Sequence, residues 1–178
     1  MGFMAAGKTT IGRHLARLLD VPFVDTDEAI VRRHGPIARL FAERGEAGFR
    51  AVELAAVREA LDGPVGVIAL GGGAVAHAPT RDALAGRALR VYLDISAEEI
   101  VARLRRSRTI RPLVGGEPDE ARVRELLAQR LPFYRESELI VPGPQRTKTA
   151  FAREIADRLR LRSRQCSGAR DVEGNDDL

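Results

Sequence analysis

The sequence predicts an α/β fold, a parallel sheet covered by helices on both faces, and two observations carry this prediction. Short, nearly continuous apolar runs alternate with segments of helical periodicity, as expected for strands buried on both faces. Polar or glycine-rich residues directly follow several of these runs, at the strand ends where such sheets bind ligands. With 178 residues, 44% hydrophobic and 30% charged, the chain is expected to form one soluble domain.

The first half of the chain alternates between helical and extended patterns. Residues 8–19 predict a helix, because Ile11, Leu15 and Leu18 fall on one stripe. The apolar run 21–24 predicts a strand that ends at Asp25-Thr26-Asp27. Helices are expected at 27–34, 37–43 and 46–61, and a continuous apolar strand at 65–70 leads into the glycines 71–73.

The second half continues the alternation. A strand is expected at 89–94, and Ser96 and Glu99 form a capping box that opens a helix over 97–106. The polar segment 108–117 reads as a loop, a helix bent by Pro132 begins near residue 120, and a strand at 139–141 precedes a helix at 149–161. Residues 163–178 are polar and aperiodic, so we expect a disordered tail after a domain that spans residues 1–162.

The composition argues against several classes of protein. Aromatic residues make up only 4% of the chain and the arginines are not massed in one segment, so we expect no nucleic-acid partner. No apolar stretch approaches the roughly 18 residues of a membrane span. Cys166 is the single cysteine, which excludes a disulfide framework and favours the cytoplasm. We expect a monomer.

The run Gly2-Phe3-Met4-Ala5-Ala6-Gly7-Lys8-Thr9 matches the Walker A pattern of phosphate-binding loops. Such a loop curls its backbone N–H groups around the phosphates of ATP, at the positive end of the following helix. Its lysine, here Lys8, reaches the β- and γ-phosphates, and its hydroxyl residue, here Thr9, takes Mg²⁺. The alternative is a chance glycine-rich turn, but a helical pattern begins where this chemistry requires it. Lysine is also rare here: only Lys8 and Lys148 occur among 29 basic residues.

A loop of this kind follows a strand in the middle of the sheet, yet only Met1 precedes Gly2. We therefore expect the first, central strand to be missing from this sequence. Either the start of the chain was assigned too late or the sequence is a truncated copy, and the intact motifs that follow favour the first explanation.

Six segments together resemble the shikimate kinase family, over residues 2 to about 160. Each segment is weak alone, and in chain order they are Gly2-Phe3-Met4-Ala5-Ala6-Gly7-Lys8-Thr9-Thr10, Asp25-Thr26-Asp27, Gly45-Glu46-x-x-Phe49-Arg50-x-x-Glu53, Gly71-Gly72-Gly73-Ala74, Arg111-Pro112-Leu113 and Arg130-x-Pro132-x-Tyr134. The resemblance implies a three-layer P-loop kinase fold. It also implies transfer of the γ-phosphate of ATP to the 3-hydroxyl of shikimate, giving shikimate 3-phosphate for aromatic amino-acid biosynthesis.

The resemblance also implies roles for individual residues. Lys8, Asp27 and Arg111 are the catalytic candidates: Asp27 would take the proton of the attacking hydroxyl, and Arg111, in a lid over 108–117, would close on the γ-phosphate. Thr9 and Asp25 would hold Mg²⁺, Asp25 through water. ATP would contact Gly2, Ala5, Ala6, Gly7, Lys8, Thr9, Thr10, Arg103 and Arg111, with Arg103 packed on the adenine. Shikimate would contact Asp27, Arg50, Glu53, Gly71, Gly72, Gly73 and Arg130, with Arg50 and Arg130 on its carboxylate.

Simpler interpretations exist for several of these residues. An Asp-x-Asp at a strand end is often a turn or a helix cap, and Arg50–Glu53 alone would be a surface ion pair. Gly71–Gly73 could be a plain turn, and the arginines around Arg103 a solvated helix face. Ala5 also departs from the family, which usually has glycine there. Two rival functions remain: a kinase of the same fold for gluconate or a nucleotide, and a non-catalytic P-loop protein.

Overall fold

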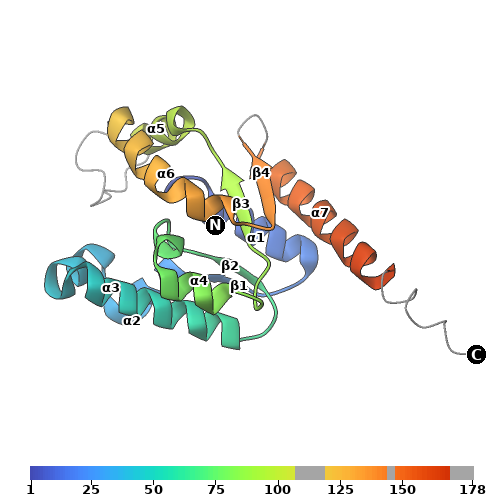
Figure 1. Ribbon diagram of the computed structural model, residues 1–178, viewed down its shortest axis with the longest axis horizontal. Coiled ribbons are helices and arrows are strands. Elements are labelled where there is room, and N and C mark those ends of the chain that lie inside the picture. Colours follow the sequence, from blue (N-terminus) through green and yellow to red (C-terminus); the bar gives the residue numbers. More distant parts are fainter. Residues whose placement is uncertain (107–118, 144–146, 169–178) are drawn as a thin grey trace, which may run out of the picture.

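The computed structural model describes residues 1–106, 119–143 and 147–168, and Figure 1 shows their arrangement. Helices alternate with short strands along the chain, as expected. The elements are, in order, α1 (Lys8–Leu19), β1 (Phe23–Asp25), α2 (Thr26–His34), α3 (Ile37–Asp62), β2 (Val67–Ala69), the 3₁₀ turn η1 (Ala74–Ala76), α4 (Ala78–Leu84), β3 (Val91–Asp94), α5 (Ala97–Arg106), α6 (Glu120–Arg135), β4 (Leu139–Pro142) and α7 (Lys148–Gly168).

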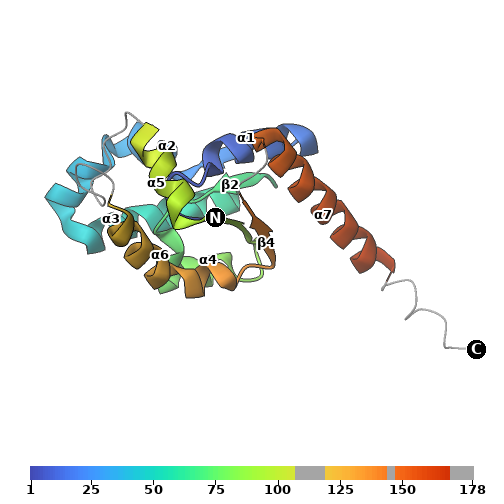
Figure 2. The same cartoon turned by 90° about the horizontal axis from the view of Figure 1, so that it is seen from above.

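All strand pairing among the described residues is parallel. β1 pairs with β2, with Val24 opposite Ile68, and β3 pairs with β4, with Tyr92 opposite Ile140. Each pair is connected through helices, as parallel strands require. Figure 2 shows the strands between α1 with α7 on one side and α4 with α6 on the other. The prediction of an α/β fold with parallel strands and helices is confirmed.

The main chain of Met1 lies beside β3. The Met1 amino group donates to the carbonyl of Val91 at 2.5 Å, and the N–H of Leu93 donates to the carbonyl of Met1 at 3.0 Å. This is the pattern of a parallel ladder with Tyr92 opposite Met1. Burial and, to a smaller extent, the nearby charge of Lys8 lower the pKa of the Met1 amino group to about 5.

A cavity of about 420 Å³ lies next to Met1, between β2 and β3. Its walls are mostly apolar side chains of α1, the two strands and α7, among them Ile11, Leu15, Ile68, Val91, Leu93 and Ile155. Close-packed protein interiors rarely leave voids much larger than a water molecule, so this region is loosely packed. The expectation of a missing central strand stays a prediction.

The helices expected at 37–43 and 46–61 are both present. They are joined in α3, but the backbone between them is non-helical at Gly45, where φ is 63°. Two other helices differ from the predictions. The sequence analysis does not predict α4, because a helix of only seven residues shows too little periodicity to detect. α7 extends beyond the expected end at 161 to Gly168, so the first part of the predicted tail is helical. Residues 169–178 lie outside the described residues.

The apolar residues form two clusters that underlie different parts of the molecule. The larger cluster contains Phe3, Ile11, Leu93, Ile100 and Phe151, so the start of the chain is anchored in it. The smaller cluster contains Ile30, Leu40 and Phe49 and joins α2 to α3. No helix among the described residues is both long and apolar enough to cross a membrane.

Candidate active site

The segments expected at strand ends lie against one another in the structure. We call residues 2–9 the phosphate loop and residues 71–73 the glycine segment. Arg130 links these two, because its guanidinium donates to the carbonyl of Gly72 at 3.3 Å and lies 5.3 Å from the ring centroid of Phe3. Thr9 links the phosphate loop to the end of β1 by donating to Asp25 at 2.6 Å. The phosphate loop, the end of β1 and the glycine segment therefore meet in one place, which we call the crevice.

The phosphate loop is anchored by buried side chains and shaped by unusual backbone angles. Phe3, Met4 and Ala6 are buried, which fixes the loop to the larger core. Gly7 takes φ 97° at the N-cap of α1, and Ala5 takes φ 58°, a region that residues with a Cβ seldom enter. The loop thus leads directly into the positive end of a helix, which is the arrangement that binds anions.

Lys8 is folded back onto its own loop. Its ammonium donates to the carbonyls of Gly2 and Phe3, each at 3.0 Å. Thr10, the other expected ATP contact at this end, lies partly exposed in the first turn of α1. The positive charge is therefore held at the loop and is within one side-chain movement of a bound phosphate.

Asp25 has the simpler role of a helix cap, and it also contacts Thr9, the other residue expected to hold Mg²⁺. Its Oδ1 accepts the N–H groups of Asp27 at 3.0 Å and Glu28 at 3.2 Å, so it caps α2. Its Oδ2 faces Thr9, so a hydroxyl and a carboxylate meet beside the phosphate loop. The described residues contain no cluster of three or more His, Cys, Asp or Glu side chains that could hold a metal. Oxygen ligands of this kind suit Mg²⁺, which usually keeps several waters and takes substrate phosphates as further ligands.

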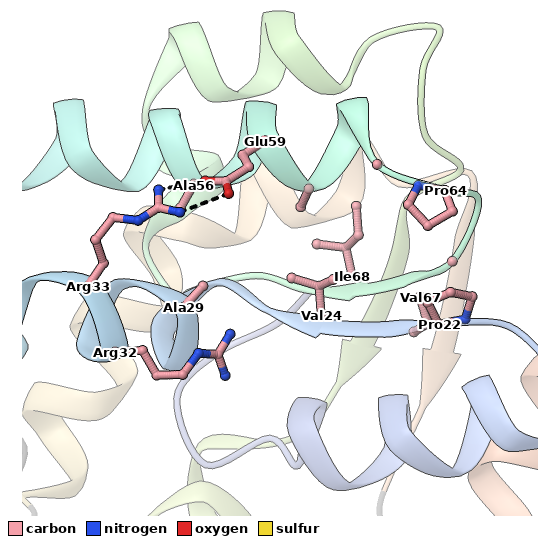
Figure 3. Close-up of a pocket in the computed structure, with 13 residues that line it drawn as sticks. Pro22, Val24, Ala29, Arg32, Arg33, Ala56, Glu59, Pro64, Val67 and Ile68 are labelled. Atoms are coloured by element: carbon pink, nitrogen blue, oxygen red, sulfur yellow. Dashed lines mark hydrogen bonds and ion pairs between the residues drawn. The ribbon is translucent and has the colours of Figure 1, made fainter.

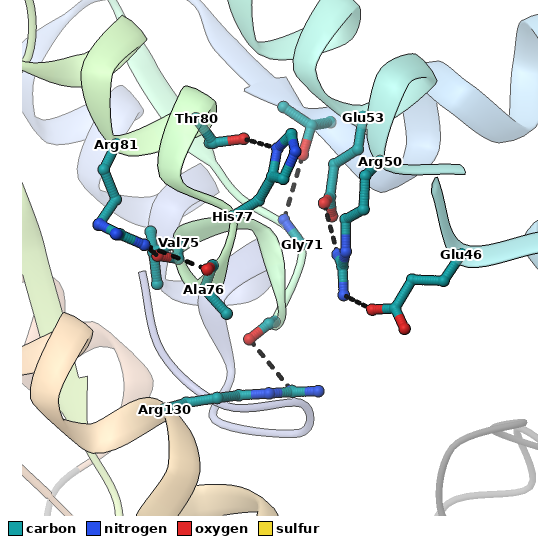
Figure 4. A network of polar contacts seen from close by, with 12 residues as sticks. Glu46, Arg50, Glu53, Gly71, Val75, Ala76, His77, Thr80, Arg81 and Arg130 are labelled. Atoms are coloured by element: carbon teal, nitrogen blue, oxygen red, sulfur yellow. Dashed lines mark hydrogen bonds and ion pairs between the residues drawn. The ribbon is translucent and has the colours of Figure 1, made fainter. Parts of the chain in front are cut away.

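Arg50 and Glu53 form a largely buried pair, not the surface ion pair that their spacing alone would favour. Arg50 donates to Glu53 at 2.6 Å and to Glu46 at 3.2 Å (Figure 4). The side chains of Arg50 and Glu53 are only 13% and 2% exposed. Burial raises the pKa of the Glu53 carboxyl, the charge of Asp27 adds to the rise, and the Arg50 guanidinium opposes it.

The glycine segment allows the charged side chains to approach the backbone closely. A Cβ added at Gly71 would lie 2.5 Å from Glu53 Oε1 and 2.7 Å from Asp27 Oδ1, and one added at Gly73 would lie 2.8 Å from Arg50 Nη2. Any larger residue at these two positions would displace the carboxylates or the guanidinium. The segment is therefore more than a plain turn, because it forms the floor of a charged pocket.

Three further residues that the sequence analysis did not assign fix the glycine segment and the turn η1 that follows it. Thr26, fully buried, accepts the N–H of Gly71 at 3.2 Å and donates to the carbonyl of Ala69 at 3.3 Å. Tyr134 donates to the carbonyl of Gly72 at 2.5 Å, and burial raises its pKa to about 12. Arg81 donates to the carbonyls of Val75 and Ala76 (Figure 4). For Thr26, the signal available in the sequence was its position between the two candidate aspartates, Asp25 and Asp27.

Two of the expected arginines stand apart from the rest. Arg103 donates to the carbonyls of Ala5 at 3.3 Å and Ala6 at 2.9 Å, so it contacts the phosphate loop and is not simply part of a solvated helix face. Arg111 and the expected lid at 108–117 lie outside the described residues.

The cavity in Figure 3 lies away from this crevice. It has a volume of about 490 Å³ and opens between the strands β1 and β2 and the helices α2 and α3. Its charged residues are Arg32, Arg33 and Glu59, and the last two are paired with each other at 2.7 Å. None of the residues expected in the active site lines it.

Known proteins resemble this chain along most of its length. The family model described as "Shikimate kinase" matches residues 4–160. The chain is 47% identical over 161 residues to the shikimate kinase of Mycobacterium avium (strain 104), covering 89% of this chain and 90% of that protein. It is 44% identical over 165 residues to the shikimate kinase of Mycobacterium tuberculosis (strain ATCC 25177 / H37Ra), covering 92% and 93%.

Solved structures resemble the fold as well. The structure of shikimate kinase from Acinetobacter baumannii in complex with shikimate superposes with a TM-score of 0.85 at 38% identity, covering 90% of each chain. The shikimate kinase structure from Bacteroides thetaiotaomicron gives a TM-score of 0.82 at 33% identity, covering 90% of this chain and 96% of that one.

Proposed function

This chain belongs to the shikimate kinase family, and we propose on that premise that it transfers the γ-phosphate of ATP to the 3-hydroxyl of shikimate. One observation carries the proposal beyond family membership: Asp27, Glu53 and Arg50 all meet the glycine segment, and Arg130 joins that segment to the phosphate loop. A carboxylate-binding pocket therefore adjoins a phosphate-binding loop, as a kinase for a hydroxylated acid requires.

The substrate side supplies binding and a proton acceptor. Arg50 and Arg130 grip the shikimate carboxylate, because guanidinium groups bind carboxylates in a bidentate manner. Glu53 orients Arg50 through their hydrogen bond at 2.6 Å. Asp27 lies at the N-terminus of α2 and accepts the proton of the attacking hydroxyl.

The nucleotide side supplies positive charge and backbone donors. The N–H groups of the phosphate loop surround the phosphates, and Lys8 exchanges the carbonyls of Gly2 and Phe3 for the β- and γ-phosphates. Thr9 and Asp25 would hold Mg²⁺, which neutralises charge on the phosphates when bound. Thr10 contacts the phosphates, and Arg103 contacts the nucleotide. Arg111, within the lid at 108–117, contacts the γ-phosphate, and this last role rests on the resemblance alone.

Three broader features belong to the same proposal. The kinase domain spans residues 1–162, and it acts as a monomer in the cytoplasm, where its single cysteine suits a reducing compartment. An apolar extended segment joined ahead of Gly2 would lie between β2 and β3 as the central strand. The ladder bonds of Met1 and the apolar cavity beside it support this position.

A coupled assay of ADP release tests the function and separates its rivals. With ATP and Mg²⁺, we expect turnover with shikimate and little with nucleoside monophosphates, because the buried arginines select a carboxylate. Gluconate also carries a carboxylate, and we expect little turnover with it because the chain belongs to the shikimate kinase family. If the chain preferred gluconate or a nucleoside monophosphate, that compound would replace shikimate as the proposed acceptor of the phosphoryl group. Binding of ATP and shikimate without turnover would support the non-catalytic P-loop protein instead.

A further inference from the structure

Ala5 introduces a local strain into the phosphate loop. Its φ of 58° is left-handed, a conformation in which the Cβ of an L-residue is crowded by its own backbone. Glycine takes this conformation without that crowding. Some other contact must therefore keep the Ala5 turn in place, because the loop binds phosphates only while its N–H groups are correctly directed.

Arg103 makes the contact that matches this requirement. Its Nη1 lies 3.3 Å from the carbonyl oxygen of Ala5 and 2.9 Å from that of Ala6. Both carbonyls directly follow the strained φ angle of Ala5, and rotating Ala5 out of the left-handed region would turn its carbonyl away. Hydrogen bonds from a charged donor are roughly twice as strong as neutral ones, so the guanidinium is well suited to hold the turn.

The guanidinium is itself held in position. Its Nε donates to Glu99 at 2.9 Å, one helical turn earlier on α5. α5 is fixed by the buried residues Ala97, Ile100, Val101 and Leu104. On the other side, Nη1 would lie 3.6 Å from a Cβ built at Gly7, so the group rests directly against the end of the loop.

We propose that Arg103 is a positioning residue that holds the left-handed turn at Ala5, and thereby keeps the phosphate loop ready to bind polyphosphate. Its task differs from that of Lys8, which occupies the carbonyls of Gly2 and Phe3 and leaves them for the ligand. The inference rests on the proposed function only in taking residues 2–9 to bind phosphates. It differs from a role in packing on adenine, because a loop-holding residue affects any ligand that carries the phosphates.

The first experiment compares two ligands in the full chain. Dissociation constants for ATP and for inorganic tripolyphosphate, both with Mg²⁺, are measured by calorimetry for the wild type and Arg103→Met. We expect the variant to bind both ligands about tenfold more weakly, the change that corresponds to losing one well-placed interaction. Arg105→Met is the matched control, because Arg105 lies on the same helix with an exposed side chain, and we expect a change below about twofold.

The second experiment asks whether the loss acts through Ala5. In the Ala5→Gly background the turn no longer strains a Cβ, so Arg103→Met should weaken tripolyphosphate binding by less than about threefold. Arg103→Gln is measured in parallel, so that the result does not depend on the stability of a single variant. A rescue by glycine would not arise if Arg103 contacted the phosphates directly.

The outcomes separate this inference from the function on which it rests. Loss of ATP affinity with unchanged tripolyphosphate affinity would overturn it in favour of adenine packing. Equal losses in the Ala5 and Ala5→Gly backgrounds would overturn it in favour of direct contact. A wild-type chain that bound neither ligand would overturn the proposed function itself, and this inference with it.

Discussion

The two sides of the crevice hold their charges in different ways. On the nucleotide side, Lys8 and Arg103 donate to backbone carbonyls of the phosphate loop. On the substrate side, Arg50 is paired with the carboxylates of Glu53 and Glu46, and its side chain is only 13% exposed. The contrast is clearest between Lys8, whose ammonium donates to neutral backbone groups, and Arg50, which is paired with opposite charges.

This difference indicates how each side responds to its ligand. A lysine on neutral carbonyls can exchange them for phosphate oxygens, which are stronger acceptors because they are charged. A buried ion pair costs much more to disrupt, because removing one partner leaves an uncompensated charge in a poorly solvated place. We therefore expect Arg50 to stay in place when shikimate binds, whereas Lys8 should move from its carbonyls to the phosphates when ATP binds.

The largest effect is expected from completing the sheet that precedes the phosphate loop. Adding about four to eight mostly Val, Ile or Leu residues ahead of Gly2 should raise the Tm by about 10 °C or more. The added strand would pair with the facing edges of β2 and β3, where each satisfied backbone group contributes about 1–3 kcal/mol. Melting curves with and without ATP and Mg²⁺ measure this.

An equally long extension of Ser and Gly residues is the control, and it should leave the Tm almost unchanged. If the chain without an extension melted as high and phosphorylated shikimate equally well, the proposed place of the strand beside Met1 would be wrong.

The next largest effect is expected from a substitution on the nucleotide side alone. Lys8→Ala should lower kcat by about 10³-fold, because the lysine stabilises charge that develops in the transition state. Shikimate binding and the Tm should change little. Lys148→Ala is the matched control, since Lys148 is the only other lysine and is exposed at the start of α7. Near-normal turnover of Lys8→Ala would exclude the phosphate-loop assignment.

A smaller effect is expected when the substrate side is broken. Arg50→Ala should lower kcat/KM for shikimate. The loss should correspond to at least about 2 kcal/mol of transition-state binding, the cost of truncating one partner of a buried charge pair. The KM for ATP should hardly change. Arg39→Ala tests the same helix at an exposed pair, because Arg39 binds Glu43 at 2.5 Å with 69% of its side chain exposed. Equal losses for both ligands in Arg50→Ala would make Arg50 a structural residue.

The smallest effect is a pH dependence confined to the substrate side. Because burial raises the pKa of Glu53 in the folded state, the folded protein binds this proton more tightly than the unfolded chain does. The contribution of Glu53 to the free energy of unfolding should therefore fall as pH rises from about 4.3, the unperturbed value, through the raised pKa.

Denaturant unfolding of the wild type and Glu53→Gln across this range measures the effect. The difference between the two proteins should change with pH in that direction, whereas Lys148→Ala, which replaces an exposed lysine, should follow the wild type. A difference that did not vary with pH would mean that Glu53 keeps an ordinary pKa.

Much of the crevice could be predicted from local sequence patterns. The apolar runs gave the four strands to within a few residues, and parallel pairing brought their polar ends together. The sequence predicts Thr9 and Asp25 as joint ligands of Mg²⁺, and their side chains meet at 2.6 Å, whereas the metal site itself stays a prediction. Their proximity could be predicted because a strand end and a phosphate loop are defined by residues that are adjacent in the chain.

Other features depend on contacts between distant parts of the chain. The spacing of Arg50 and Glu53 fits an exposed helix pair equally well, and only the packing of the glycine segment against them makes Glu53 buried. The contact of Arg103 with Ala5 and Ala6 joins residues almost a hundred positions apart, so no local pattern could indicate it. The sequence alone determined the fold class, the family and most of the candidate residues. The tertiary structure decided which charges are buried and which carbonyls they hold, because desolvation and hydrogen bonding depend on neighbours in space.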